Sequence, residues 1–341
     1  MRHLLAALAL LLLLAAPAGA RPIVIKVVVL TTFEVGADTG DAPGEFQHWV
    51  ETWPLKKTAV VPGIERPVRY SADGVLGVVT GMRARPREAI AALVSGRQFD
   101  VSHAYWIVAG IAGVDPRTGS IGSAAWARWV VDGDPLYEMD DREAPADWPW
   151  GLYALGEHAP GRKGSARGSS GMAWKLDSGL VSWAWGLTKD LALPDNDQLR
   201  AARALYPSEA QALLPPRVML GDALGTVRFW HGERRTQWAR DWVKLWTDGD
   251  GALVMSDCED QGVLDVLTIY GAQGRVDPRR VLVLRTASNY TREPDGAQPV
   301  LKAFTPGGAA AAFQAAWLAG APVVRALVSD WPRWRDHIPG H

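Results

Sequence analysis

The chain has 341 residues, and its 36 Lys and Arg residues nearly balance 37 Asp and Glu residues, which leaves a formal net charge of −1. This balance, together with the lack of any basic run in the sequence, argues against a nucleic-acid partner. The single cysteine, Cys258, excludes an internal disulfide, so a sizeable hydrophobic core has to hold the fold.

Residues 1–20 have the pattern of a signal peptide. Arg2 precedes an almost unbroken run of Leu and Ala that ends in small residues before Arg21, which is the arrangement of a secretory leader. An uncleaved anchor is the alternative, but the run is short for a membrane span. No later stretch approaches roughly 18 continuous apolar residues. We therefore expect a periplasmic or secreted mature chain with no transmembrane bundle of its own.

Beyond the leader, apolar strands alternate with helical segments, and this order predicts an α/β fold. We expect a three-layer α/β/α sandwich with a central mixed sheet, formed by residues 21–341 as a single domain. A long excursion at about 137–206 is rich in Trp, Gly and Pro, and its 161–171 part has the composition of a mobile loop. Strands are expected at 23–30, 75–80, 104–108, 124–131, 216–220 and 281–290, and helices at 87–94, at 233–246 and from about 260 to 270.

The helix expected at 233–246 carries Trp238, Trp242 and Trp246, which recur four residues apart. That spacing puts the three indoles on one helical stripe. Core packing explains such a stripe better than stacking on a sugar.

The most distinctive stretch is 104–134, which reads AYWIVAGIAGVDPRTGSIGSAAWARWVVDGD. Its expected strand breaks at Gly110-Ile111-Ala112-Gly113, where missing side chains let the backbone come close to a ligand. In open α/β sheets, small ligands bind at the carboxyl ends of the strands. Gly110 and Gly113 are therefore predicted ligand contacts, although a bare glycine turn is the commoner meaning of so short a fragment.

Taken whole, the run GIAG-x-DP-x-x-G-x-GSAAWAR-x-VVDGD resembles the purine nucleoside permeases, which in turn look like a branch of the nucleoside phosphorylases. The resemblance extends from about Lys26 to the last helix. It implies a nucleoside phosphorylase-like fold and purine nucleosides as ligands. Two activities are compatible with it: cleavage of the N-glycosidic bond by phosphorolysis or hydrolysis, which we favour, and non-catalytic binding that assists nucleoside uptake. The resemblance implies no cofactor, with inorganic phosphate at most a co-substrate, and it leaves a homo-oligomer open.

Two segments carry the expected contacts to a nucleoside. In the phosphorylase relatives, an acidic residue at a strand-to-helix junction accepts hydrogen bonds from the 2′ and 3′ hydroxyls of the sugar, and Glu259 matches that position. The alternative is an acidic helix N-terminus stabilised by the helix dipole. The strand at 281–290 ends in Ser288-Asn289, where the relatives hydrogen-bond N7 of the purine. Asn289 can donate to charge that develops on the base but cannot act as a general acid, and an Asx turn is the alternative.

Phe229-Trp230-His231 follow an expected strand and either stack on the purine or belong to the core. The nucleophile is open. Ile111 stands where many relatives have Ser or Thr for phosphate, whereas Glu34 stands near the end of the first strand, where hydrolytic relatives have acidic residues. A carboxylate there would repel phosphate and could activate water as a general base.

Gly81, Arg83 and Arg128 are the remaining candidates for holding a phosphate, with ordinary exposure to solvent as the alternative. No metal site is predicted, because the acidic cluster at 257–260 brings no His and the sequence has no H-E-x-x-H motif or paired cysteines. We expect Gly110, Gly113, Glu259 and Asn289 to converge on one pocket, because neighbouring parallel strands deliver their carboxyl ends to the same edge of a sheet.

Overall fold

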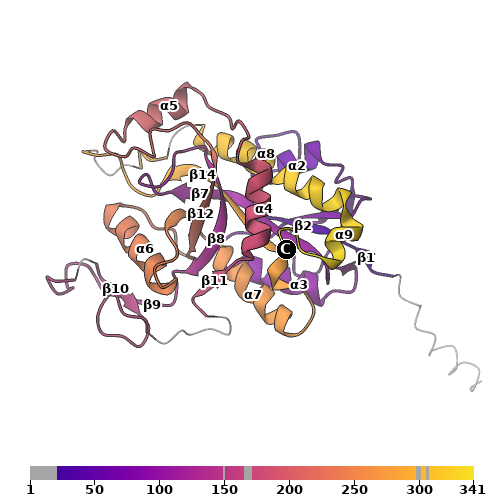
Figure 1. Ribbon diagram of the computed structural model, residues 1–341, viewed down its shortest axis with the longest axis horizontal. Coiled ribbons are helices and arrows are strands. Elements are labelled where there is room, and N and C mark those ends of the chain that lie inside the picture. The colour runs from indigo at the N-terminus through magenta and orange to yellow at the C-terminus, as the bar shows by residue number, and fades with distance from the viewer. Residues whose placement is uncertain (1–20, 149, 165–170, 297–300, 305–306) are drawn as a thin grey trace, which may run out of the picture.

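The computed structural model describes residues 21–341, apart from 149, 165–170, 297–300 and 305–306 (Figure 1). The predicted signal peptide and part of the predicted mobile loop lie outside the described residues.

A mixed sheet forms the centre of the molecule and, within the described residues, contains ten strands. Central strands such as Val27–Thr31 and Val75–Val79 are apolar and fully buried, as expected for a sheet that is covered on both faces. In order across the sheet they are β11 (Ala173–Lys175), β8 (Ala124–Asp132), β12 (Val218–Gly225), β13 (Leu253–Asp257), β7 (Tyr105–Val114), β2 (Val27–Thr31), β5 (Val75–Val79), β4 (Val68–Tyr70) and β3 (Lys57–Ala59), while β14 (Val281–Tyr290) pairs with both β7 and β8. Two short pairs stand apart, β1 (Ile23–Val24) with β6 (Phe99–Asp100) and β9 (Leu136–Glu138) with β10 (Leu152–Ala154).

Five of these strands close on themselves. β14 runs parallel to β7 over its whole length and antiparallel to β8 at Leu284–Thr286. Because β8 also pairs with β12, β12 with β13, and β13 with β7, the circuit returns to its start. Closure of this kind removes free strand edges and leaves a defined mouth at one end of the circuit.

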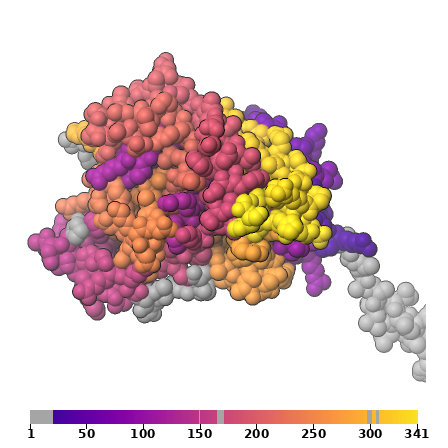
Figure 2. Space-filling view, in the orientation of Figure 1, coloured from indigo at the N-terminus to yellow at the C-terminus, as the bar shows by residue number. Residues whose placement is uncertain are grey.

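Helices cover the sheet in two layers. On one side, α4 (Ser178–Thr188) and α8 (Gly308–Ser329) pack on the sheet, with α2 (Gln47–Thr52) and α9 (Trp331–Asp336) against α8; on the other, α3 (Arg85–Ser95) packs on α7 (Asp260–Ala272) (Figure 1). α6 (Glu233–Trp246) lies against β12 and β13. The remaining described helices are α5 (Asp197–Ala204) and a short 3₁₀ helix at Pro278–Arg280. Figure 2 shows α4 beside the C-terminal helices on one surface. The expected three-layer α/β/α arrangement is confirmed.

α8 is the one described helix that is long and apolar enough to cross a membrane. Of its most apolar 18-residue stretch, 61% is buried in the molecule, and the helix packs on β14 and β7. A buried core helix has the same length and composition, and here the sheet accounts for the apolar surface of α8.

Two expected elements differ from the structure. The glycines 110–113 lie inside one long strand, β7, because their backbone pairs with residues 285–289 of β14; the loop begins only at Asp115. β12 continues to Gly225, beyond the expected end at 220, because its small residues pair with β8 and β13. The stripe on α6 is core as predicted: Trp238 and Trp242 are buried and contact one another.

Candidate functional site

A cavity of about 570 Å³ opens where β7, β13 and β14 end, and its size is within the usual range for a small-molecule site. Three acidic side chains line it: Glu45, Asp257 and Glu259. Ser288 and Asn289 add polar groups at the end of β14. Apolar side chains make up much of the rest, namely Phe33, Met82, Ile111, Phe229 and Phe304.

The predicted convergence of distant residues is found for Gly113, Glu259 and Asn289, which all line this cavity. The expected reason was wrong, because β13 runs antiparallel to β7. Met255 lies beside Val114 and Ser256 beside Gly113, so the chain after β13 travels back along β7. The closed circuit of strands, rather than a common parallel edge, brings Glu259 to the cavity.

Arg285 is the centre of a buried group of charges beside the cavity. Its side chain is 1% exposed, and its Nη2 atom lies 2.7 Å from Asp260, 3.2 Å from Glu259 and 3.6 Å from Asp257. Its Nη1 atom donates to the carbonyl oxygen of Ile111 at 3.1 Å. One guanidinium thus serves three carboxyl groups.

Glu45, which sequence reasoning missed, lies beside Gly110 of β7 together with Arg285: a Cβ atom added at Gly110 would be 2.7 Å from Glu45 Oε1 and 2.6 Å from Arg285 Nη1. Gly110 does not line the cavity. It is needed because no side chain fits between these two charged groups. We call Glu45, Asp257, Glu259, Asp260 and Arg285 the Arg285 cluster.

The carboxyl group of Glu45 is held by hydrogen bonds from the end of β2 and from β7. It accepts from the backbone N–H of Thr32 at 2.6 Å, from the Thr32 hydroxyl at 2.8 Å and from the backbone N–H of Ile111 at 2.7 Å. Burial raises the pKa of Glu45 from its usual 4.5 to about 7, and the nearby Arg285 opposes this rise only in part. A carboxyl group poised near neutrality can act as either acid or base.

Glu259 begins α7 and is held on two sides. Its carboxylate accepts from the backbone N–H of Arg83 at 3.2 Å and from Arg285 at 3.2 Å. Burial raises its pKa, with Arg285 opposing. Asp257 instead caps α7, since its Oδ1 atom accepts from the backbone N–H groups of Glu259 and Asp260 at 2.9 and 2.8 Å. The helix-terminus explanation therefore accounts for Asp257, while Glu259 faces the cavity.

Two further groups in this part of the lining have raised pKa values. Burial, followed by repulsion from Asp260, raises the pKa of Asp257 well above its usual value, and its Oδ2 atom has no hydrogen-bond partner within the described residues. Burial raises the pKa of the Cys258 thiol to about 12. This thiol is therefore protonated at neutral pH and is a poor nucleophile.

Ser288 and Asn289 lie at a bulge in β14. The register with β7 shifts between Ala287 and Asn289, which sets Asn289 beside Gly113. The Ser288 hydroxyl is 2.9 Å from Asn289 Oδ1, and Asn289 Nδ2 donates to the Tyr290 carbonyl at 3.0 Å. One N–H of this amide remains for a ligand.

Of the three aromatic residues predicted to bind the base, only Phe229 lines the cavity. It is 53% exposed and contacts Phe304, with ring centroids 5.7 Å apart. Trp230 is buried against Trp238 in the hydrophobic core, and His231 Nε2 pairs with Glu293 at 3.1 Å. Neither lines the cavity, because the chain turns inward after Phe229.

Glu34 lies outside this cavity and organises the loop before α2. Its carboxylate accepts from the backbone N–H groups of Val35, Phe46 and Gln47 at 2.6–2.8 Å, and also from Gly44. Four backbone donors hold this carboxylate within the loop, away from the cavity. Because these donors flank Glu45, Glu34 positions the segment that carries the cavity's own buried acid.

Two of the three predicted phosphate contacts lie together, and the third lies apart from them. Gly81 and Arg83 line an adjoining cavity of about 530 Å³, together with Glu34. Arg128 lies on β8 and pairs with Asp222 at 2.7 Å. It lines neither of these two cavities.

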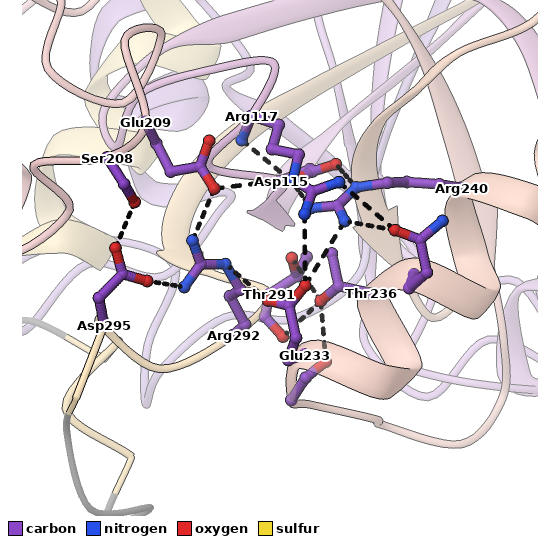
Figure 3. Close-up of polar contacts among 12 residues, drawn as sticks. Asp115, Arg117, Ser208, Glu209, Glu233, Thr236, Arg240, Thr291, Arg292 and Asp295 are labelled. Carbon is purple, nitrogen blue, oxygen red and sulfur yellow. Dashed lines mark hydrogen bonds and ion pairs between the residues drawn. The ribbon is translucent and has the colours of Figure 1, made fainter. Parts of the chain in front are cut away.

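A second group of charges lies near the ends of β7 and β14 (Figure 3). We call Asp115, Glu209, Glu233, Arg240, Arg292 and Asp295, with Arg117 at the edge, the Arg292 cluster. Arg240 binds both oxygens of Asp115, at 2.6 and 2.7 Å. Arg292 pairs with Glu209 at 2.7 Å, with Asp295 at 2.8 Å and with Glu233 at 2.9 Å. The cluster anchors the segments that follow Val114 and Tyr290, next to a cavity of about 540 Å³.

The described part of the chain contains no group of three or more His, Cys, Asp and Glu residues arranged to hold a metal ion.

A family model described as purine nucleoside permease matches residues 24–339. Among curated proteins, the chain is 25% identical over 262 residues to a probable purine nucleoside permease of Schizosaccharomyces pombe, covering 74% of this chain and 75% of the relative. It is 24% identical over 320 residues to a purine nucleoside permease of Candida albicans, covering 90% and 76% of the two chains.

Among solved structures, the fold is similar to a 5′-methylthioadenosine/S-adenosylhomocysteine nucleosidase from Neisseria meningitidis, with a TM-score of 0.52 and 15% identity over 88% of this chain and 99% of that one. It is also similar to futalosine hydrolase of Helicobacter pylori, with a TM-score of 0.53 and 12% identity over 88% and 98%. At such identities the likeness shows the fold, which is the nucleoside phosphorylase-like fold expected from the sequence.

Proposed function

Since the chain belongs to the purine nucleoside permease family, we propose that it binds purine nucleosides and cleaves their N-glycosidic bond with water. The cavity beside the Arg285 cluster is the proposed site. It combines an acidic end, at Glu45 and Glu259, with an amide at Asn289 and an apolar lining. A nucleoside has the matching parts: a polyhydroxyl sugar and a flat base with polar edges.

In this proposal Glu259 binds the sugar. Its two carboxylate oxygens can accept hydrogen bonds from the 2′ and 3′ hydroxyls together. Arg285 and the backbone N–H of Arg83 already fix the orientation of this carboxylate, so ligand binding costs little side-chain entropy here. The free N–H of Asn289 binds N7 of the base, and Phe229 and Phe304 contact the purine ring.

The observation that carries the proposed reaction is the buried carboxyl group of Glu45, whose pKa is raised to about 7. In its ionised form Glu45 accepts a proton from a water molecule as the water oxygen bonds to C1′ of the sugar. The electron pair of the C1′–N9 bond moves onto the purine, and the Asn289 N–H stabilises that charge at N7. The departing base then takes a proton from solvent.

The charges around the cavity favour water over phosphate. No guanidinium lines the cavity within the described residues, and Arg285 is already shared by three carboxyl groups. An excess of carboxylates repels a phosphate dianion, and it stabilises the positive charge that develops on the sugar as the glycosidic bond breaks.

The test uses purified protein beginning at Arg21, incubated with inosine, guanosine and adenosine, with and without phosphate. We expect free base and free ribose at rates that do not depend on phosphate. Glu45→Gln should lose turnover and keep nucleoside binding. Ribose 1-phosphate formed only when phosphate is present would instead identify a phosphorylase.

A second candidate is nucleoside binding without turnover, in support of uptake. It is favoured by the Asn289 amide, which cannot protonate the leaving base, and by the hydrogen bonds that already occupy Glu45. This candidate predicts micromolar binding of a nucleoside that remains intact over hours in the same assay.

We also propose that residues 1–20 direct export, which would place the mature protein in the periplasm or outside the cell. Mass spectrometry of the exported fraction should find a chain that begins near Arg21. Intact protein that retains Met1 and stays in the membrane fraction would contradict this.

A further inference from the structure

We propose that the nucleoside site accepts an anionic group on the 5′ carbon, a phosphate monoester above all, and that the guanidinium of Arg83 binds it. This inference rests on the proposed function, because it assumes that the sugar lies at Glu259. It extends that function by naming the substrate class: nucleoside 5′-monophosphates rather than plain nucleosides.

Arg83 lies on the sugar side of the cavity. Its backbone N–H donates to Glu259 Oε1 at 3.2 Å, so its α-carbon is next to the carboxylate assigned to the 2′ and 3′ hydroxyls. An Arg side chain that starts there reaches groups on the sugar before it reaches the base. The sugar position that is left for such a contact is C5′.

The residue type at position 83 is not explained by the backbone contact. Arg83 adopts a left-handed conformation, with φ of 64°, which costs a residue with a side chain more than it costs glycine. The hydrogen bond to Glu259 needs only the backbone N–H, and glycine would supply it with less strain. Arginine at such a position indicates that its side chain has a use.

Among the arginines that line the neighbouring cavities, Arg83 is the one whose guanidinium has no carboxylate partner within the described residues. Arg83 lines two further cavities, of about 530 and 490 Å³. The other arginines that line them each have an acidic partner within the described residues: Arg66 has Asp38 at 3.8 Å, Arg85 has Glu65 at 3.4 Å, and Arg228 has Glu138. No such partner is found for Arg83 in the described part of the chain.

The larger of these two cavities shares lining residues with the nucleoside cavity. Thr32, Phe33 and Met82 border both. A substituent that leaves the sugar past these residues enters the space that Arg83 lines. A phosphate monoester suits that space, because a guanidinium binds two phosphate oxygens at once.

Free inorganic phosphate offers the same oxygens to Arg83, and the experiment has to separate the two sources. Dissociation constants are measured by calorimetry for inosine, for inosine 5′-monophosphate, and for inosine in millimolar phosphate. Glu45→Gln serves as the background, so that no turnover disturbs the titration. The variants are Arg83→Gly, which keeps the N–H to Glu259, and Arg85→Gln, which removes a paired arginine at the start of α3 that lines the same cavity.

We expect the background protein to bind the monophosphate at least tenfold more tightly than inosine. Arg83→Gly should bring the two ligands within about twofold by weakening the monophosphate alone, and Arg85→Gln should keep the preference. The inference is overturned if no preference exists or if it survives Arg83→Gly. It is also overturned if free phosphate tightens inosine binding through Arg83, because the anion is then a co-substrate. Failure of inosine itself to bind would refute the proposed function, and this inference with it.

Discussion

The Arg285 cluster is centred inside β14 and the Arg292 cluster just past its end, yet the two balance their charges in opposite ways. In the Arg285 cluster one buried guanidinium serves three carboxyl groups, and Glu45 adds a fourth. In the Arg292 cluster three arginines share four acids, and two of these acids, Glu233 and Asp295, are 55% and 42% exposed at their side chains.

The consequence for the acids is visible in their pKa values. Burial raises the pKa of Glu45, Asp257 and Glu259. Hydrogen bonds from Ser208 and then Arg292 lower the pKa of Asp295. A buried cluster with surplus acid keeps a carboxyl group, that of Glu45, whose pKa of about 7 suits proton exchange near neutral pH. The Arg292 cluster, with more arginines and with partly exposed acids, holds its ions in pairs and secures the ends of two strands.

The sharpest way to break this comparison is to neutralise one acid in each cluster. Glu45→Gln should lower the rate of nucleoside cleavage by about 10²–10⁴-fold, the usual contribution of a general base. Glu209→Gln, in the Arg292 cluster, should change the rate less than about threefold, a change of under 1 kcal/mol. Single-turnover measurements of base release test both. Equal losses in the two variants would mean that the clusters do not differ in function.

Removal of the two arginines compares the clusters through stability. Arg285→Met should lower the free energy of unfolding by about 3–5 kcal/mol, because it leaves several buried carboxyl groups without their cation. Arg292→Met should cost about 1–2 kcal/mol, since each partly exposed pair contributes less than about 1 kcal/mol. Urea unfolding followed by tryptophan fluorescence measures both. If Arg285→Met does not fold at all while Arg292→Met does, the order of the two effects stands; the reverse order contradicts it.

Glu259→Ala tests the sugar contact within the Arg285 cluster. Loss of a charged hydrogen-bond partner should cost about 2–4 kcal/mol of transition-state stabilisation, seen in kcat/KM. With a 2′,3′-dideoxynucleoside, the parent should already lack this contribution, so the variant should lose little more. Glu233→Ala is the control from the Arg292 cluster. If Glu259→Ala lowers kcat/KM for the dideoxynucleoside as much as for the natural nucleoside, Glu259 does not contact the sugar hydroxyls.

The sequence predicted the layers of the fold because they depend on local patterns. Apolar runs such as 281–284 and the Trp stripe of α6 indicate burial directly in the residue order. The family motif then led to Glu259 and Asn289, which follow strands at recognisable positions. The antiparallel course of β13 left no such mark, because strand direction is decided by pairing between segments far apart in the chain.

Glu45 was missed for a related reason. It follows a Gly- and Asp-rich loop, and nothing in Gly44-Glu45-Phe46 distinguishes it from an exposed acid. Glu34, three residues past β2, had the expected position, but its carboxylate is used by the loop's own backbone N–H groups. The one signal was Gly110: a glycine inside an apolar strand indicates a close approach from outside the strand. Its neighbour proved to be a charged pair of side chains rather than a ligand.

The pH dependence separates a cluster acid from a merely buried one. The pKa of Glu45 and that of Asp132 are both raised to about 7, chiefly by burial, but only Glu45 lines the cavity. Since the folded state holds these protons more tightly than the unfolded state, each residue makes stability fall as pH rises from about 4 through 7. Glu45→Gln and Asp132→Asn should each flatten that fall in melting temperature.

Activity should respond to only one of the two. The cleavage rate should rise with pH around 7 as Glu45 ionises, and Asp132→Asn should leave that inflection in place. An inflection that moves with Asp132→Asn would show that the titrating group is not at the cavity.

The smallest expected effect is at Asn289, whose amide has one N–H left for a ligand after its bond to Tyr290. A single neutral hydrogen bond contributes about 0.5–1.5 kcal/mol, so Asn289→Ala should weaken guanosine by roughly three- to tenfold. The nucleoside 7-deazaguanosine carries C–H in place of N7 and cannot accept this bond. The parent should therefore bind it about as weakly as Asn289→Ala binds guanosine, and the variant should bind both nucleosides alike. If instead the variant still discriminates between the two, N7 is recognised by another group, and the base does not bind with N7 toward Asn289.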